Sequence, residues 1–205
     1  LIRPILKDAL DINIVEGRHP VVEKSLMIKG ENFVANDFTI NEKTKTWLMT
    51  GPNMAGKSTF LRQNAIIILM AQVGCFVPAQ KAEIGVIDKI FTRIGASDDL
   101  ASGQSTFMTE MVETARILNG ATRRSLVILD EVGRGTSTSD GFAIALAILE
   151  FLVKEIKCPT LFATHYHDLA HHAKNFNQIL PKTLKTKKWN GNIIFLYKVI
   201  DGVSQ

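Results

Sequence analysis

The strongest constraint on the fold is a glycine-rich segment between a predicted strand and a predicted helix. Residues 51–58 read Gly-Pro-Asn-Met-Ala-Gly-Lys-Ser and directly follow the apolar run Thr46–Thr50. Helical periodicity then begins near Lys57 and continues to about Val73. A strand that turns through glycines into a helix is a building unit of α/β folds, in which helices pack against a largely parallel sheet. We therefore expect an α/β fold.

Residues 51–58 also match the pattern G-x-x-x-x-G-K-[ST] of phosphate-binding loops. Glycines let such a loop wrap closely, so that backbone N–H groups and the positive end of the next helix face the same anion. Lys57 is predicted to reach the β and γ phosphates of a nucleotide, Ser58 to bind Mg²⁺, and Thr59 to support the start of the helix. The alternative, a chance glycine turn before a helix, is disfavoured by the strand–loop–helix context.

Two carboxylates follow a second apolar run. Residues 126–129 are continuously apolar, which is typical of a buried parallel strand, and Asp130 and Glu131 come directly after them. Open α/β sheets bind ligands at the carboxyl ends of their strands. Asp130 is expected to hold the metal and its water shell, and Glu131 to polarise an attacking water. Acids often end strands, so this pair is informative only together with the loop at Gly51.

Strand-like and helical runs alternate along the chain, as expected for a parallel sheet wrapped by helices. Asn190-Gly191-Asn192 is a hairpin turn signal before the last strand. Further strands are predicted at residues 11–15, 87–94, 160–163 and 193–199, and helices at 109–118 and 141–155.

Two polar residues are candidates for the same site on weaker grounds. His165 follows the predicted strand at 160–163, so it should emerge at the same edge of the sheet, where a histidine could contact the γ-phosphate or the attacking water; taken alone, the residue is better interpreted as a surface histidine near a strand end. Gln80 follows a turn after a helix and could sense the metal. Histidines also occur at 167, 171 and 172, but their spacing lacks the closing ligands of a zinc site.

Composition limits the classes of protein. The chain is 46% hydrophobic and 21% charged, which excludes a disordered tail or a coiled coil. No apolar run approaches the ~18 residues that a membrane span needs. The net charge of +4 invites a nucleic-acid interpretation, but the one basic cluster, residues 182–188, has a single aromatic neighbour and is predicted to be a solvated loop or turn flank. Cys75 and Cys158 are predicted to be reduced core thiols.

The ordered string of motifs resembles the ATPase domain of the MutS family of DNA mismatch repair proteins. The resemblance covers essentially all 205 residues, and the Gly-Pro-Asn-Met and Gly-Arg-Gly-Thr-Ser stretches separate it from other phosphate-loop proteins. The matching segments are residues 16–20, 51–59, 76–80, 98–108, 129–138 and 162–165. Ala55 departs from the family pattern, which commonly has glycine there; a methyl group is tolerable if the residue keeps a negative φ.

The resemblance implies a P-loop NTPase of the ABC-ATPase type, with a mostly parallel sheet flanked by helices. It implies a dimer in which each nucleotide lies between the phosphate loop of one subunit and the signature segment of the other. Ser105 is then the signature serine that reaches the partner's nucleotide, and residues 133–137 form the loop that crosses the interface. Catalysis is assigned to Glu131 as the carboxylate, His165 as the switch histidine, and Lys57.

The same resemblance assigns the ligands, ATP or ADP and Mg²⁺. The adenine is expected between Phe33 and Tyr197 with Val34 beside it, and Asn53 is expected to approach the γ-phosphate. The remaining nucleotide-binding residues are Gly51, Pro52, Met54, Ala55, Gly56, Lys57, Ser58 and Thr59. The metal is assigned to Ser58, Asp130 and Gln80.

Domain organisation and partners follow from the family as well. The chain begins without Met and stops after a strand-like run, so we expect a piece of a longer polypeptide. Residues 1–30 are expected to lead in from a preceding helical domain, and 31–205 to form the ABC-type ATPase domain, truncated before C-terminal dimerisation helices. Expected partners are a second MutS-family subunit (identical or different), mismatched double-stranded DNA bound through domains outside this chain, and a MutL-type protein, with no membrane. The expected compartment is the bacterial cytoplasm and nucleoid, or the nucleus or mitochondrion of a eukaryote.

Three alternatives stay open at this point. The first is that the chain comes from a related family member that acts in recombination rather than repair. The nucleotide-binding domain of an ABC transporter shares the fold, but it requires an LSGGQ-type signature, which residues 101–106 fit poorly. A nucleotide-gated DNA clamp would depend on binding more than on turnover, and single-turnover kinetics would separate it from an ATPase.

Overall fold

The computed structural model describes residues 1–94 and 106–203, which form an α/β fold with two mixed sheets. Residues 95–105 lie outside the described residues, and they include Ser105 and most of the matching segment at 98–108. The larger sheet has the order β10-β9-β4-β8-β7-β6, in which β10 and β9 are antiparallel and all other neighbours are parallel. Its strands are β4 (Thr46–Thr50), β6 (Ile90–Arg93), β7 (Leu126–Asp130), β8 (Thr160–Ala163), β9 (Ile179–Trp189) and β10 (Asn192–Asp201).

A second sheet, which the sequence did not predict, has the order β1-β5-β2-β3. Only β1 and β5 are parallel in it. Its strands are β1 (Ile5–Lys7), β2 (Ile12–Gly17), β3 (Asn36–Ile40) and β5 (Lys81–Gly85). β1 and β2 thus pair with strands beyond residue 30, while the proposed domain division at that residue stays a prediction.

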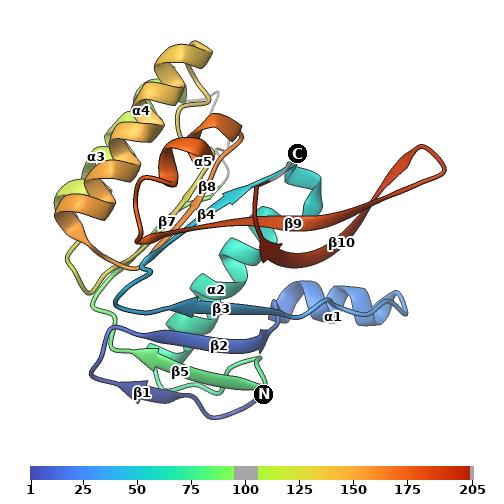
Figure 1. Cartoon of the computed structure of the whole chain (residues 1–205). Coiled ribbons are helices and arrows are strands. Elements are labelled where there is room, and N and C mark those ends of the chain that lie inside the picture. The colour runs from blue at the N-terminus through green and yellow to red at the C-terminus, as the bar shows by residue number, and fades with distance from the viewer. Residues whose placement is uncertain (95–105, 204–205) are drawn as a thin grey trace.

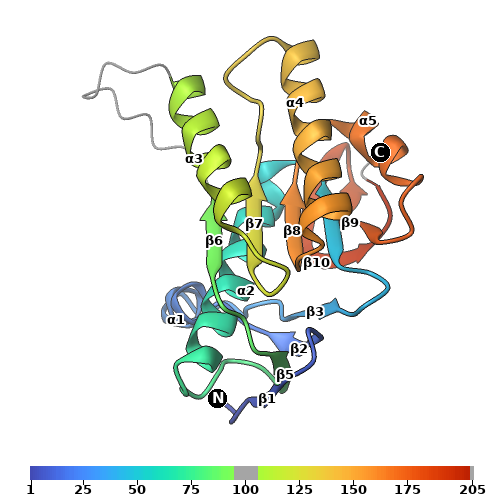
Figure 2. The same cartoon turned by 90° about the vertical axis from the view of Figure 1, so that its left-hand side faces the viewer.

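The helices form layers around the sheets. Helix α2 lies between the two sheets, and α3, α4 and α5 cover the other face of the larger sheet (Figures 1 and 2). The helices are α1 (Pro20–Ile28), α2 (Lys57–Gln72), α3 (Thr106–Gly120), α4 (Thr138–Phe151) and α5 (His167–Ala173), with a 3-10 turn η1 (Asn53–Ala55) and a π-helical turn η2 (Leu152–Ile156). Within the described residues, no helix is long and apolar enough to cross a membrane.

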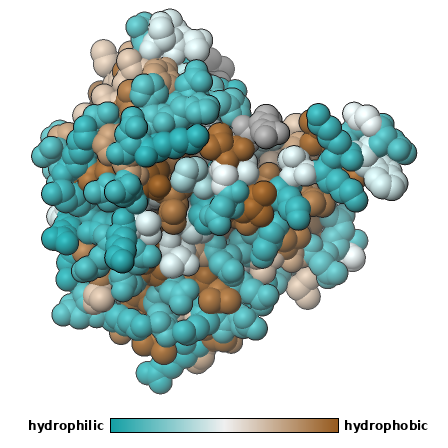
Figure 3. Space-filling model, viewed as in Figure 1, coloured by the Kyte–Doolittle hydropathy of each residue, from teal (hydrophilic) through white to brown (hydrophobic). Residues whose placement is uncertain are grey.

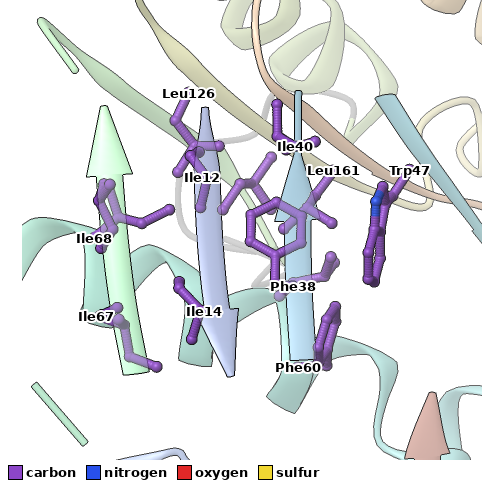
Figure 4. Packing of buried hydrophobic residues seen from close by; sticks show 14 of the residues in the cluster. Ile12, Ile14, Phe38, Ile40, Trp47, Phe60, Ile67, Ile68, Leu126 and Leu161 are labelled. Atoms are coloured by element: carbon purple, nitrogen blue, oxygen red, sulfur yellow. The ribbon is translucent and has the colours of Figure 1, made fainter. Parts of the chain in front are cut away.

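The continuous apolar run of β7 exists because both faces of the larger sheet are covered. Leu126 and Ile128 belong to the core between the sheets, whereas Val127 and Leu129 belong to the core beneath α3, α4 and α5. Figure 4 shows the first of these cores, where α2 packs between strands of both sheets. There Trp47 stacks on Phe60 at a ring distance of 5.9 Å, and its indole N–H donates to the Thr39 carbonyl at 2.8 Å, which joins β4 to the end of β3.

The basic cluster at residues 182–188 is part of strand β9 and not a loop, so the loop prediction is wrong, whereas the strand does flank a turn and residues 185–188 are exposed. Lys182 and Thr183 pair with β4, and most of the cluster pairs with β10. The hairpin turns at Asn190 and Gly191, both with positive φ. Long-range pairing of this kind overrides the local preference of lysine for loops. Figure 3 shows hydrophobic residues among hydrophilic ones along this projecting hairpin, and Trp189 is 58% exposed.

One smaller expectation also differs from the structure. Cys158 is buried, but Cys75 is exposed, because it follows the end of α2 at the surface.

Candidate nucleotide site

The loop after β4 has the backbone conformation that its glycines permit. Gly51 and Gly56 have φ values of 121° and 100°, which side-chain-bearing residues adopt only under strain. Ala55 is fully buried and is not among the residues with positive φ, so its methyl group is accommodated. Gly56 is the N-cap of α2 and offers no side-chain cap. The first N–H groups of α2 are therefore left for another acceptor, such as an anion.

Lys57 places a buried cation inside this loop. Its side chain is fully buried, and its ammonium donates a hydrogen bond to the Gly51 carbonyl and lies 3.9 Å from the Glu131 carboxylate. Burial lowers the pKa of Lys57, while the negative charges of Glu131 and Asp130 oppose that shift. The loop thus holds a desolvated positive charge where the phosphate pattern predicts one.

Ser58 and Asp130 meet at the carboxyl end of β7, as predicted. The Ser58 hydroxyl donates to Asp130 Oδ2 at 2.7 Å. Asp130 is 5% exposed, its burial raises its pKa, and its other oxygen, Oδ1, is buried without a hydrogen-bond partner. A buried carboxylate oxygen without a partner, next to a hydroxyl, is a donor set that a hard cation such as Mg²⁺ satisfies.

Glu131 stands on strained backbone at the same edge. Its φ is 57°, and its N–H donates to the Ala163 carbonyl at 2.9 Å, which ties it to the end of β8. Its carboxylate accepts from Arg134 at 2.7 Å and faces Lys57. Positive φ at a residue with a side chain is uncommon and often marks a functional position.

His165 follows β8 and lies near these charges. It is exposed, with its ring 4.0 Å from the Tyr166 ring. Partial burial lowers the pKa of His165, and the Glu131 charge acts against that shift. The neutral imidazole therefore predominates at neutral pH, able to donate one hydrogen bond.

A network that the sequence did not reveal holds the chain after Glu131. The buried Glu110 accepts from the Gly133 N–H at 2.8 Å, and the Tyr166 hydroxyl donates to the Gly133 carbonyl at 2.8 Å. Gly133 has a φ of 90° and lies against the backbone of Gly141. No sequence signal could identify these partners, because they come from three separate helices and loops. Arg134, within this segment, has a side chain 70% exposed.

A cavity of about 350 Å³ opens beside the loop, and the three residues assigned to the adenine are among those that line it. Phe33, Val34 and Tyr197 line it together with Gly56 and Thr59 of the loop. Tyr197 has a φ of 53° at the bulge in β10, and its ring lies against Gly56, where an added Cβ would be 3.2 Å from the ring.

Asn36 holds the strands around this cavity, and sequence reasoning missed it. Its amide donates to the carbonyls of Tyr197 at 2.9 Å and Val34 at 3.2 Å, and its side-chain oxygen accepts from the Val199 N–H at 2.8 Å. The side chain is buried. A single asparagine at the start of a strand has no distinguishing pattern in the sequence.

Some assigned residues are not brought together. Gln80 is exposed just before β5, its N–H donates to the Val15 carbonyl, and within the described residues it makes no hydrogen bond to Ser58 or Asp130. Pro52 accepts from the Ala55 N–H, and Met54 is 79% exposed at the edge of the cavity. Asn53 lies in η1. In the part of the chain that the structure describes, no group of three or more His, Cys, Asp or Glu is placed to hold a metal.

Comparison with known families identifies the family of this chain. The family described as MutS domain V matches residues 47–205. This chain belongs to the MutS family. The match begins one residue into β4 and includes the loop, both carboxylates and His165. The resemblance that the motifs carry is therefore confirmed.

Relatives named DNA mismatch repair protein MutS match this MutS-family chain over nearly its whole length. The protein of Orientia tsutsugamushi (strain Ikeda) is 57% identical over 202 residues, and that of Rickettsia canadensis (strain McKiel) is 54% identical over 203 residues. That of Zymomonas mobilis is 52% identical over 202 residues. These matches cover 98–99% of this chain but only 23% of each relative.

Gly133→Ala is expected to lower the free energy of unfolding by about 3 kcal/mol. An added Cβ would lie 2.4 Å from the Gly141 carbonyl oxygen, and the φ of 90° adds strain. The matched control is Gly30→Ala, with a similar φ of 75° and nothing within 4 Å, which should lose about 1 kcal/mol. Urea unfolding of both variants measures the difference. Equal losses would mean that Gly133 is needed for its φ alone.

Asp130→Asn is expected to raise the free energy of unfolding at pH 7, without Mg²⁺, by about 1 kcal/mol. The pKa of Asp130 is raised above 3.8 by burial, so the folded chain holds this proton more tightly than the unfolded chain. Its contribution to stability is complete below pH 3.8 and is lost as the pH rises through the raised value. Urea unfolding should therefore show a gain at pH 7 that vanishes near pH 4; a loss at pH 7 would contradict the prediction.

Proposed function

We propose that this chain binds ATP with Mg²⁺ and hydrolyses it to ADP and phosphate within a DNA mismatch repair protein. One observation carries the proposal: the Gly51 loop, the Ser58–Asp130 pair and Glu131 meet at one edge of the sheet, beside a cavity lined by Phe33 and Tyr197. Each part has a role in nucleotide hydrolysis, and their convergence is what such a reaction requires.

The proposed fold type is a P-loop NTPase of the ABC-ATPase kind. The parallel pairings from β9 through β6 support it, as does the position of the loop between β4 and α2. In this arrangement α2 points its amino end at the phosphates. The proposed ATPase domain spans residues 31–205, and 1–30 connect it to a preceding domain.

In the proposed complex the adenine enters the cavity between Phe33 and Tyr197, with Val34 at its edge. Stacking on aromatic rings suits the flat base, and the Gly56 backbone beside Tyr197 leads directly to the phosphates. Loop residues 51–59 present N–H groups to the phosphates. Lys57 exchanges its bond to the Gly51 carbonyl for the β and γ phosphate oxygens, a stronger, charge-assisted contact.

Ser58 and Asp130 would hold Mg²⁺, because a hydroxyl and a carboxylate oxygen without a partner lie side by side there. When bound, the metal neutralises charge on the phosphate oxygens and orients them. Gln80 is proposed as a further residue on the metal side, which would require it to move toward Ser58.

Glu131 is proposed to accept the proton of the attacking water as the water oxygen bonds to the γ-phosphorus and the bond to the ADP oxygen breaks. Its contact with Arg134 must open for that role, and Arg134 is largely exposed and free to turn away. Lys57 and a hydrogen bond from neutral His165 stabilise the charge on the transferring group. Asn53 is proposed to contact the same group.

The proposed active unit is a dimer with a second MutS-family subunit, identical or different. Ser105 would reach the nucleotide of the partner, and the segment at 133–137 would cross the interface. The rigid support of Gly133 by Glu110 and Tyr166 then transmits the state of the Glu131 site to that surface. Dimerisation would thereby couple nucleotide state to DNA state.

The role of the whole protein is proposed from its relatives. Their names favour repair over recombination and over an ABC transporter. Mismatched DNA would be bound by domains beyond this chain, and a MutL-type protein would act with it. The named relatives are bacterial, which favours the cytoplasm over a nucleus or mitochondrion.

The proposal is tested by measuring ATP binding to this chain by equilibrium dialysis, with Mg²⁺ and with EDTA, and ATP hydrolysis under single-turnover conditions. We expect ATP binding that depends on Mg²⁺ and that GTP displaces with a different affinity from unlabelled ATP. We also expect slow ATP hydrolysis that accelerates as dimers form. Absence of nucleotide binding in a folded chain would overturn the proposal. Binding without single-turnover hydrolysis by the dimer would favour the nucleotide-gated clamp.

A further inference from the structure

A second cavity lies at the opposite edge of the larger sheet from the Gly51 loop. Its volume is about 250 Å³, and Lys45 and Thr46 line it at the beginning of β4, with Cys158 just before β8. β4 and β8 run parallel from Thr46 and Thr160, so their beginnings share one edge and their ends the other. The five residues of β4 separate the two sites by roughly 17 Å. The cavity is therefore distinct from the proposed nucleotide site.

The charges around this cavity are unbalanced. Lys45, Arg123 and Lys157 line it against one carboxylate, Glu42. Within the described residues, none of the three cations forms a salt bridge or donates a side-chain hydrogen bond. Two neighbouring cations do form salt bridges: Arg124 pairs with Asp8, and Lys154 pairs with Glu150.

Lys45 is the buried member of this group. It is 9% exposed, and its backbone is fixed on both sides: its N–H donates to the Gln178 carbonyl at 3.1 Å and its carbonyl accepts from Thr160 at 2.9 Å. Burial is the main cause that lowers the pKa of Lys45, and the positive charge of Arg123 lowers it further. The negative charge of Glu42 raises it. A lysine whose side chain is largely buried and whose charge lies near two further cations is stabilised when an anion occupies the space between them.

We propose that the cavity lined by Lys45, Arg123 and Lys157, the Lys45 pocket, binds a phosphate group. A tetrahedral dianion has enough oxygens to accept from the Lys45 ammonium and from both exposed side chains at once, and a guanidinium can donate two parallel bonds to it. The exposed side chains of Arg123 and Lys157 stand at the entrance. The phosphate comes either as the free ion or as the terminal phosphate of a nucleic acid strand.

The test is calorimetric titration of inorganic phosphate into this chain at constant ionic strength. It uses a Lys57→Met background, so that the Gly51 loop does not contribute. We expect one binding site, weakened at least about tenfold by Lys45→Met and by Arg123→Gln combined with Lys157→Gln. The exposed double variant keeps the test decisive if Lys45→Met does not fold. The matched control, Lys185→Gln on β9, removes an exposed charge away from the pocket and should leave the affinity unchanged.

A second arm identifies the source of the phosphate. A short oligonucleotide is compared with and without a 5′-phosphate. Tighter binding of the phosphorylated strand, lost in the pocket variants, supports the proposal with a nucleic acid terminus as the source, and binding of inorganic phosphate alone supports it with the free ion. Equal binding of both strands with no phosphate binding would overturn it, as would pocket variants that match Lys185→Gln. Neither outcome depends on the nucleotide site, because Lys57 is already replaced.

Discussion

A chain with Glu131→Gln is expected to bind ATP with unchanged affinity and to hydrolyse it at least about 100-fold more slowly. Glutamine preserves the size of the side chain and can still accept a hydrogen bond from Arg134, but it cannot take a proton from water. The phosphate loop, Lys57 and the Ser58–Asp130 pair are untouched by the change. The prediction is therefore a separation of binding from chemistry.

The measurement combines single-turnover hydrolysis with equilibrium ATP binding under conditions where dimers form. Glu155→Gln is the matched control, because Glu155 is exposed in η2 and is not among the residues of the proposed nucleotide site. It should change neither quantity. Hydrolysis at the wild-type rate in Glu131→Gln would show that another group activates the water, and a parallel loss of binding would show that Glu131 acts by organising the loop.

Lys57→Met is expected to weaken ATP binding by about 100-fold or more while leaving the chain without ligand at least as stable as the wild type. Two charge-assisted contacts to phosphate are lost. In the folded chain without nucleotide, however, Lys57 is a fully buried cation, and methionine fills a similar volume without a charge to desolvate.

The pH dependence supplies an independent check on the same variant. Burial lowers the pKa of Lys57 below 10.5, so between that lowered value and pH 10.5 the unfolded chain binds more protons than the folded chain. Wild-type stability from this group therefore rises with pH across that window. The advantage of Lys57→Met should be largest at neutral pH and shrink as the solution becomes alkaline, as measured by urea unfolding. If Lys57→Met bound ATP as tightly as the wild type, the assignment of Lys57 to the phosphate site would be wrong, whatever the stability of the variant.

Local signals explain which parts of the fold were predictable. The positions of β4, α2, β7 and β8 follow from short apolar runs and from a loop whose glycines must adopt positive φ. The hairpin turn at Asn190-Gly191 was predictable for the same reason. In each case the physical cause lies within a few residues of chain, either a backbone conformation that glycine permits or burial on both faces of one strand.

Other features depend on residues far apart in the sequence. The smaller sheet joins β1 and β2 to β5, about 70 residues later in the register Ile12↔Ile84, and no local pattern marks that pairing. The lysines at 182–188 look like a loop until β4 and β10 pair with the strand that carries them. Glu110 and Tyr166 became visible as supports of Gly133 only through their hydrogen bonds.

The candidate site divides along the same line. Lys57, Ser58, Asp130 and Glu131 were identifiable from motifs, because a phosphate loop and a strand-end carboxylate require particular residue types at fixed spacing. The cavity beside them, the clamp of Asn36 on Tyr197 and the unpaired cations of the Lys45 pocket arise where strands from distant segments come together. The site residues that belong to local motifs follow from the sequence alone, because their chemistry depends on residue types at fixed spacing. The shape and charge of the cavities between elements depend on contacts between distant segments, so they could be known only from the tertiary structure.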